Sequence, residues 1–268
     1  MTETSNGYYY ENKLGRFYYQ VHGPQNAQAV VFSHGVAMDQ RTFDSQVAAL
    51  KQEYRVVTWD MPYHGRSDSI DKGLPFSQVS TDLLADILDE VGIKQAVFAG
   101  LSLGSFIVQQ MSARHPDRVK AEVHISGGPL HPKFPSILRI SIPIITLFMK
   151  LYPAGPLGRS FGKHKALREE TIAYLLETID QTGKDAVTHL TNEMVRDMAD
   201  GLPAPPDKPR LIVYGDHDLA MLNNMTKKWH QRLPGSELAE VENAHHILNQ
   251  DNPEAFNAIL REFLKRNS

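Results

Sequence analysis

A ten-residue stretch, Ala96 to Ser105, constrains the fold more than any other part of the sequence. It begins as a short apolar run, passes through Gly-Leu-Ser-Leu-Gly at residues 100–104 and continues at once into a helical pattern. This order is typical of a nucleophile elbow, a sharp strand-to-helix turn that lifts a serine hydroxyl above the end of a sheet. Ser102 would hold a strained backbone, which requires nearly side-chain-free neighbours on both sides. The following helix would point its first N–H groups at the same place and stabilise negative charge there.

Strand and helix patterns alternate on both sides of this stretch. Apolar strand-like runs lie at residues 29–33, 54–59, 96–99, 119–126, 210–214 and 237–241. The alternation predicts an α/β fold with right-handed βαβ units and a mostly parallel sheet covered by helices on both faces. Aromatic-rich runs at residues 8–10 and 16–21 predict an antiparallel hairpin that opens the sheet. Asn252 as N-cap and Pro253 after it predict the start of the last helix.

The alternation stops between about Gly128 and Leu202, where no strand pattern is found. Proline-punctuated apolar stretches are followed there by two helical patterns. We therefore predict a core domain of residues 1–128 and 203–268 and a helical insertion at residues 129–202, placed where it could cover Ser102. The apolar run from Pro132 to Tyr152 indicates an apolar substrate pocket or, at least as well, a face buried against the core. A basic run from Arg159 to Arg168 could receive an anionic group but is more typical of a solvated face.

Composition excludes several classes of function. The 268-residue chain carries a net charge of −3, so nothing suggests a nucleic-acid footprint, and it has no cysteine for a disulfide, a thiolate metal site or a nucleophile. Phosphate-loop, zinc-helix and dinucleotide-turn motifs are absent, so we expect no cofactor and no metal. The polar N-terminus and an apolar run too short to span a bilayer predict a cytoplasmic protein without a membrane span. The oligomeric state stays open.

The chain resembles the α/β-hydrolase superfamily, in its lid-bearing branch of esterases, haloperoxidases and C–C hydrolases. The resemblance covers nearly the whole length except the insertion. It is carried by His34-Gly35 after an apolar strand, the segment 60–67, Gly100 to Gly104, Gly215 to Asp218, and the segment 243–246 leading to Asn252-Pro253. It implies the α/β-hydrolase fold with a helical lid, and a triad in the chain order Ser, Asp, His.

The resemblance implies Ser102 as nucleophile, Asp218 as the acid and His246 as the base. The family pattern Gly-x-x-Asp selects Asp218, with Asp216 as the competing choice in the same loop. A histidine seven residues before a helix-opening proline selects His246, and His245 then stands where glycine is usual, so the assignment could be off by one.

An oxyanion hole needs two N–H donors, and we expect them to be the backbone amides of Val36 and Leu103. Five other histidines are expected to be structural or on the surface: His22, His34, His64, His115 and His124.

These residues predict a hydrolase that cleaves a carboxylic ester or related acyl bond of a small, apolar substrate through an acyl-enzyme. Two alternatives remain. One is a C–C bond hydrolase or lactonase with the same triad, and the other is a ligand-sensing or partner-binding protein with slow turnover.

Overall fold

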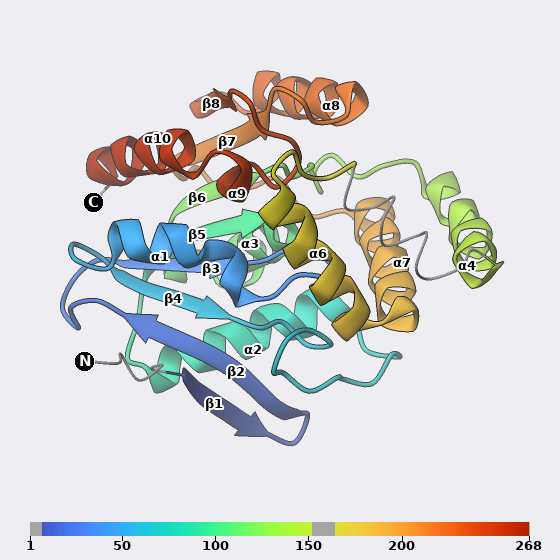
Figure 1. Cartoon of the computed structure of the whole chain (residues 1–268), viewed down its shortest axis with the longest axis horizontal. Helices are drawn as coiled ribbons and strands as arrows, with labels where there is room; N and C mark the ends of the chain where they lie inside the picture. The colour runs from blue at the N-terminus through green and yellow to red at the C-terminus, as the bar shows by residue number, and fades with distance from the viewer. Residues whose placement is uncertain (1–6, 152–163, 268) are drawn as a thin grey trace.

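The computed structural model describes residues 7–151 and 164–267, which form an eight-stranded sheet flanked by helices (Figure 1). The strand order is β1-β2-β4-β3-β5-β6-β7-β8. β1 pairs with β2 and β2 with β4 in antiparallel fashion, and every other pair is parallel. The strands are β1 (Gly7–Asn12), β2 (Gly15–His22), β3 (Ala29–Ser33), β4 (Arg55–Trp59), β5 (Ala96–Leu101), β6 (Val119–Ile125), β7 (Arg210–Gly215) and β8 (Ser236–Val241).

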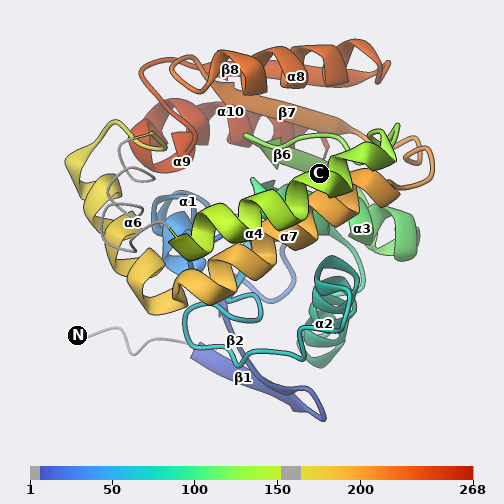
Figure 2. The ribbon, with the colours of Figure 1, turned by 90° about the vertical axis from the view of Figure 1, so that its right-hand side faces the viewer.

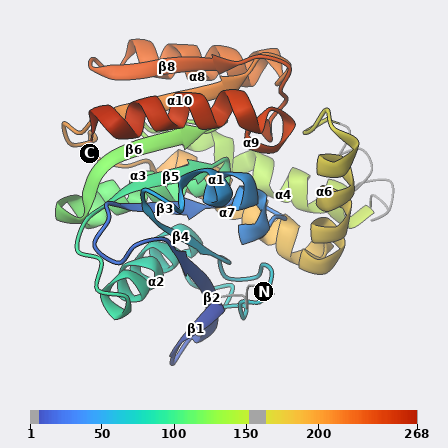
Figure 3. The same cartoon turned by 60° about the vertical axis from the view of Figure 1, so that its left-hand side comes forward.

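Helices cover both faces of the sheet, as the alternating pattern predicts. Every residue of β3, β5 and β7 is buried, which is the expected state of central parallel strands. One face packs against α2 (Phe76–Glu90), α3 (Leu103–Arg114) and α8 (Ala220–Gln231). The other packs against α1 (Asp44–Leu50) and α10 (Pro253–Arg266), which lie in front of the sheet in Figure 3. The shorter helices are η1 (Gln40–Phe43), η2 (Pro116–Arg118) and α9 (Leu248–Asp251).

The parallel strands bring four loops to the same end of the sheet. β3, β5, β7 and β8 run in the same direction, so the segments after them gather at their carboxyl ends. Those segments begin at His34, Ser102, Asp216 and Glu242. In open α/β sheets ligands bind at the carboxyl ends of the strands. The topology thus brings the predicted site residues together there from distant parts of the sequence.

Between β6 and β7 the described residues form helices and loops and no strand. These are η3 (Ser136–Ile140), α4 (Ser141–Leu151), α6 (Glu169–Thr182) and α7 (Lys184–Asp200). The two helical patterns correspond to α6 and α7, whereas α4 was not expected because of its proline. Pro143 is the third residue of α4, in the first turn, where proline is tolerated. Figure 2 shows α4 lying along α7 on the outside of the molecule.

The apolar run in this region has a buried part and an exposed part. Among residues 137–151, Ile137, Ile140, Ile144, Leu147, Phe148 and Leu151 are exposed, and Met149 is buried. Met149 and Ile145 pack against the core, so one face of the run is buried, and those six side chains lie outside that face. Within the described ranges, no helix is long and apolar enough to cross a bilayer.

Candidate active site

Ser102 occupies the turn between β5 and α3 in a strained conformation. Its φ of 54° and ψ of −111° are rare for a residue with a side chain. A Cβ on Gly100 would lie 2.1 Å from the carbonyl oxygen of Gly104, and one on Gly104 would lie 2.0 Å from the carbonyl oxygen of Ser33. Both approaches exclude a side chain. The strained turn with side-chain-free neighbours that the sequence predicts is confirmed.

The two predicted oxyanion donors lie on segments that flank Ser102. Leu103 is the first residue of α3, and the first N–H groups of a helix have no partner within it. On the other side, a Cβ on Gly35 would lie 3.4 Å from Cβ of Ser102, so the loop after β3 runs beside the serine. Val36 is the next residue of that loop. The amides of Val36 and Leu103 therefore come from the two chain segments nearest the hydroxyl.

Two buried histidines hold the loop after β3 in place. Nε2 of His34 accepts the N–H of Met61 at 3.0 Å, and Nε2 of His64 accepts the N–H of Ala37 at 3.1 Å. Burial lowers the pKa of His34 to about 4 and that of His64 to about 3, so both rings are neutral acceptors. From the sequence we expected these residues to be structural or on the surface, and both are structural. Each histidine comes shortly after a strand, and β3 and β4 are parallel neighbours in the sheet. A predicted pairing of these two strands could therefore have placed the histidines together.

His246 and Asp218 form a buried hydrogen-bonded pair. Nδ1 of His246 lies 2.7 Å from Oδ2 of Asp218, and both side chains are at least 90% buried. The Leu219 N–H donates to Oδ1 of Asp218 at 2.8 Å. Both carboxylate oxygens are therefore engaged, and the imidazole is held with Nδ1 towards the acid and Nε2 away from it.

Electrostatics favour a neutral His246 and an ionised Asp218 at pH 7. Burial lowers the pKa of His246, and the nearby positive charge of Lys165 lowers it further, against the opposing influence of Asp218. Burial alone would raise the pKa of Asp218, but the hydrogen bonds from His246 and the Leu219 N–H and the positive charge of Lys165 oppose it and the pKa falls. A neutral imidazole beside an ionised carboxylate can act as a general base.

The competing residues Asp216 and His245 make other contacts. Oδ1 of Asp216 accepts the Ala244 N–H at 3.0 Å and lies 2.8 Å from Nδ1 of His217. Nδ1 of His245 accepts the His246 N–H at 2.9 Å and is 3.7 Å from Asp218. These contacts fix the loops on which Asp218 and His246 stand. Within residues 7–151 and 164–267, no three His, Asp or Glu side chains are grouped so that they could hold a metal ion.

The second half of the insertion is fastened to the loops of this site. The Asp39 N–H donates to the hydroxyl of Tyr174 in α6 at 2.9 Å, just beyond the loop that carries Val36. The Ile247 N–H donates to the carbonyl of Lys165 at 3.0 Å, directly after His246. Helix α6 is thus tied to one of the site's loops, and the segment just before α6 is tied to another.

A groove of about 860 Å³ opens between the insertion and α8. Pro129, one of its lining residues, lies four residues after the end of β6, whereas Ser102, Asp218 and His246 do not line the groove. Its lining is mainly apolar and includes two basic residues, Lys228 and Arg232; the apolar members include Phe134, Leu138, Met198, Met221, Leu222, Met225 and Trp229.

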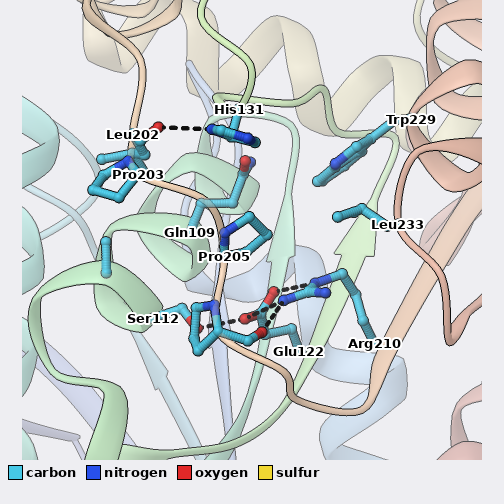
Figure 4. Close-up of a pocket in the computed structure, with 12 residues that line it drawn as sticks. Gln109, Ser112, Glu122, His131, Leu202, Pro203, Pro205, Arg210, Trp229 and Leu233 are labelled. Carbon is cyan, nitrogen blue, oxygen red and sulfur yellow. Dashed lines mark hydrogen bonds and ion pairs between the residues drawn. The ribbon is translucent and has the colours of Figure 1, made fainter.

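A buried ion pair lies beside the last turn of α3 (Figure 4). Arg210 binds Glu122 through two nitrogens at 2.6 and 3.0 Å, and Ser112 donates to the same carboxylate. His124 bridges Glu122 and Ser105 at 2.9 Å on each side. Burial opposes ionisation of Glu122, but the hydrogen bonds from His124 and Arg210 hold its pKa at about 2. Beside the pair is a cavity of about 20 Å³, room for a single water molecule.

Known proteins resemble this chain over nearly its whole length. The family model described as "Alpha/beta hydrolase family" matches residues 30–259. The 3-oxoadipate enol-lactonase 1 of Acinetobacter baylyi is 30% identical over 252 residues, which cover 92% of each chain. The carboxylesterase YbfK of Bacillus subtilis is 22% identical over 97% of this chain and 88% of its own. The crystal structure of the enol-lactonase from Burkholderia xenovorans LB400 superposes with a TM-score of 0.79 at 23% identity, covering 96% of this chain and all of the other.

Proposed function

The chain belongs to the α/β-hydrolase family, and from this premise we propose that it is a cofactor-independent serine hydrolase that cleaves a carboxylic ester or a related acyl bond. The 2.7 Å contact between Nδ1 of His246 and Oδ2 of Asp218 carries the proposal. It orients a neutral base at the edge of the sheet where Ser102 stands in its strained turn. Hydrolysis is the reaction that the names of the Acinetobacter baylyi enol-lactonase and the Bacillus subtilis carboxylesterase state.

In the proposed first step, Oγ of Ser102 attacks the acyl carbon while Nε2 of His246 takes its proton. Asp218 accepts the hydrogen bond from Nδ1–H and stabilises the imidazolium that forms. The backbone N–H groups of Val36 and Leu103 donate to the negative oxygen of the tetrahedral intermediate. His246 then returns the proton to the leaving group, and an acyl-serine remains.

In the second step water enters, and His246 takes a proton from it as it attacks the acyl-serine. The same two amides stabilise the second tetrahedral intermediate. Its collapse breaks the bond to Oγ, and the proton on His246 passes to Ser102. The carboxylic acid leaves and the serine is restored, so the cycle needs no metal or cofactor.

The insertion at residues 129–202 is the proposed lid of the core formed by residues 1–128 and 203–268. Its support is the attachment of α6 to the loop that carries Val36 and of the segment before α6 to the loop that carries His246. The groove between insertion and α8 would receive the acyl or alcohol part of the substrate. Its mainly apolar lining favours an apolar group.

A lactone is the second candidate substrate. The enol-lactonase of Acinetobacter baylyi is 30% identical over 92% of both chains, and the structure of a second enol-lactonase shares the fold. A lactone is a cyclic ester, so the two proposed steps apply unchanged, except that the leaving alcohol stays attached to the acyl group until water releases both.

A substrate panel tests the proposal. The purified chain and its Ser102→Ala variant are assayed for kcat/KM on a homologous series of p-nitrophenyl esters, on aliphatic and enol lactones, and on acyl thioesters. We expect turnover of at least one class by the wild type and its loss in the variant. A preference for lactones over linear esters of equal carbon number would select the second candidate. Turnover that persists in Ser102→Ala, or none by the folded wild type, contradicts the proposal; the latter favours a ligand-binding protein.

A further inference from the structure

Ala37 puts a strained backbone into the loop that carries the Val36 amide. Its φ of 58° lies in the left-handed region, which residues with a side chain rarely adopt. Such a conformation persists only where the surrounding contacts hold the backbone. One of these contacts is the hydrogen bond from the Ala37 N–H to His64. Val36 directly precedes Ala37, so the direction of its N–H also depends on what holds the loop beyond Ala37.

Tyr174 of α6 holds this loop on the far side of Ala37. Asp39 is fully extended, with φ of −139° and ψ of −178°, so its N–H and its carbonyl oxygen point the same way. The hydroxyl of Tyr174 accepts that N–H at 2.9 Å and donates to that oxygen at 3.1 Å. Burial raises the pKa of Tyr174 well above its usual value, so the hydroxyl keeps the proton that it donates. One side chain of the insertion thus binds both backbone polar groups of Asp39.

A second contact between α6 and this loop is a surface ion pair. Arg41 binds Glu177 of α6 at 2.9 Å, and the two side chains are 39% and 49% exposed. Exposed pairs of this kind contribute little, because solvent screens the charges and both side chains lose freedom. The contact that fixes the backbone of the loop is therefore the one from Tyr174.

The segment just before α6 is fastened to the loop of the proposed base. Oδ1 of Asp251 accepts the N–H groups of Leu167 and Arg168 at 3.0 and 3.1 Å. Its Oδ2 accepts the N–H of His245 at 2.9 Å. Figure 1 shows α6 starting beside α9, the helix that ends at Asp251. Residues 167–174 therefore bridge the two loops from which the proposed base and one proposed oxyanion donor come.

From these contacts, and on the basis of the proposed function, we infer that Tyr174 is a positioning residue for the oxyanion hole. Its hydroxyl fixes Asp39 and thereby the loop from which the Val36 N–H points. The seating of α6 is then part of the catalytic geometry, because one of the two donors is held by the insertion. The other donor, the N–H of Leu103, belongs to the first residue of α3, a helix of the core.

Tyr174→Phe tests this role, because it removes the hydroxyl and keeps the ring. Both kcat and KM are measured on the best substrate of the panel, and kcat is expressed per serine titrated with a fluorophosphonate, so that unfolded protein is not counted. We expect kcat to fall about 10- to 100-fold, since a misplaced donor costs less than a removed one, which costs roughly 10²–10³-fold. KM should stay within about threefold, because the ring that remains makes the same ground-state contacts.

A boronic acid gives a readout that a merely structural change would not move. Phenylboronic acid adds to Oγ of Ser102 as a tetrahedral anion with one oxygen in the oxyanion hole, whereas the carboxylate product binds without forming a bond. The inhibition constant of phenylboronic acid should rise about tenfold in Tyr174→Phe, and that of the product should change little.

Glu177→Gln and Tyr19→Phe are the matched controls. Glu177→Gln breaks the surface pair between α6 and the same loop. Tyr19→Phe removes a tyrosine hydroxyl that donates to Glu90 of α2 at 2.7 Å. Both variants should keep the wild-type kcat and the wild-type inhibition by phenylboronic acid.

A wild-type kcat in Tyr174→Phe, or a rise in KM alone, overturns the inference and leaves the proposed function intact. So does an equal loss of kcat in either control, because the loss would then be unrelated to the contact with Asp39. Absence of both turnover and fluorophosphonate labelling in the folded wild type would overturn the proposed function and, with it, the role of Tyr174.

Discussion

The imidazole rings of His34 and His64 meet edge to face, with 4.8 Å between their centroids and 74° between their planes. Nδ1 of His34 donates to the carbonyl of Gly35 at 2.8 Å, and Nδ1 of His64 donates to that of Pro62 at 3.0 Å. Each Nε2 is left to accept a backbone N–H. The pair therefore joins the loop after β3 to the loop after β4, and it does so only while both rings are neutral.

His64→Phe should lower kcat more than it raises KM. The variant keeps a ring of similar shape but leaves the Ala37 N–H, one residue after Val36, without its acceptor. A buried unpaired donor costs about 1–3 kcal/mol, and if the loop shifts, a loss of roughly 5- to 150-fold in kcat follows. Steady-state kinetics measure it. His115→Gln, at a half-buried histidine paired with Asp82, is the control that should keep wild-type kcat.

The imidazole of His64 also makes the stability of the fold depend on pH. In the unfolded chain His64 has a pKa near 6.5, and in the folded protein about 3, so between these values the unfolded state binds more protons. The free energy of unfolding therefore falls as pH falls below about 6.5, by roughly 2 kcal/mol at pH 5 from this residue. Burial raises the pKa of Asp60 to about 6 and that of Asp197 to about 7, which acts in the opposite direction.

Subtracting the free energy of unfolding of the His64→Phe variant from that of the wild type isolates the contribution of His64, because Asp60 and Asp197 remain in both proteins. Urea titrations at several pH values from 5 to 7.5 should give a difference, wild type minus variant, that shrinks as the pH falls. A difference that is constant across this range would show that His64 is not held neutral by the fold.

Substitutions of Asp218 and of Asp216 should differ clearly in their effect on kcat. Asp218→Asn should reduce kcat by about 10⁴-fold, because the hydrogen bond to His246 would no longer fix the imidazole in its working tautomer. Asp216→Asn keeps an oxygen for the Ala244 N–H and should stay within about tenfold of wild type. The reverse ranking would assign the acid to Asp216.

The adjacent histidines allow a parallel comparison. His246→Ala should remove nearly all activity, since the proposed base is lost, whereas His245→Ala removes an acceptor of a backbone N–H and should cost mainly stability. Burial lowers the pKa of His246, so kcat/KM of the wild type should reach its plateau before pH 7. If the acid limb of the kcat/KM profile had its midpoint above pH 7, the lowered pKa of His246 would be contradicted.

Glu122→Gln tests the buried ion pair. Removing one partner leaves the Arg210 guanidinium buried without its counter-charge, which costs about 3–5 kcal/mol in the free energy of unfolding. Glu237→Gln breaks a surface pair with Arg266 and should cost less than about 1 kcal/mol. Chemical denaturation of both variants makes the comparison, and equal costs would mean that burial adds nothing to the Glu122 pair.

Local patterns in the sequence predicted the elements that depend on local chemistry. Gly100 and Gly104 predicted the strained turn, and Asn252 is the N-cap of α10, where its side chain accepts the Ala255 N–H. The role of His64 could not be predicted, because its partner Ala37 is 27 residues away and only the adjacency of β3 and β4 brings them together. Helix α4 was missed because a proline at its third position resembles a break. Its outward-facing side chains depend on how it packs on α7, which periodicity alone does not determine.

Covalent labelling of Ser102 tests the central claim most directly. The folded wild-type chain is treated with a fluorophosphonate, which reacts with an activated serine hydroxyl, and the modified peptide is located by mass spectrometry. We expect one phosphonylated residue, Ser102, no labelling in Ser102→Ala, and slow labelling in His246→Ala because the base is absent. Labelling of a different serine, or none in protein whose fold is verified, would contradict the assignment of Ser102 as the nucleophile.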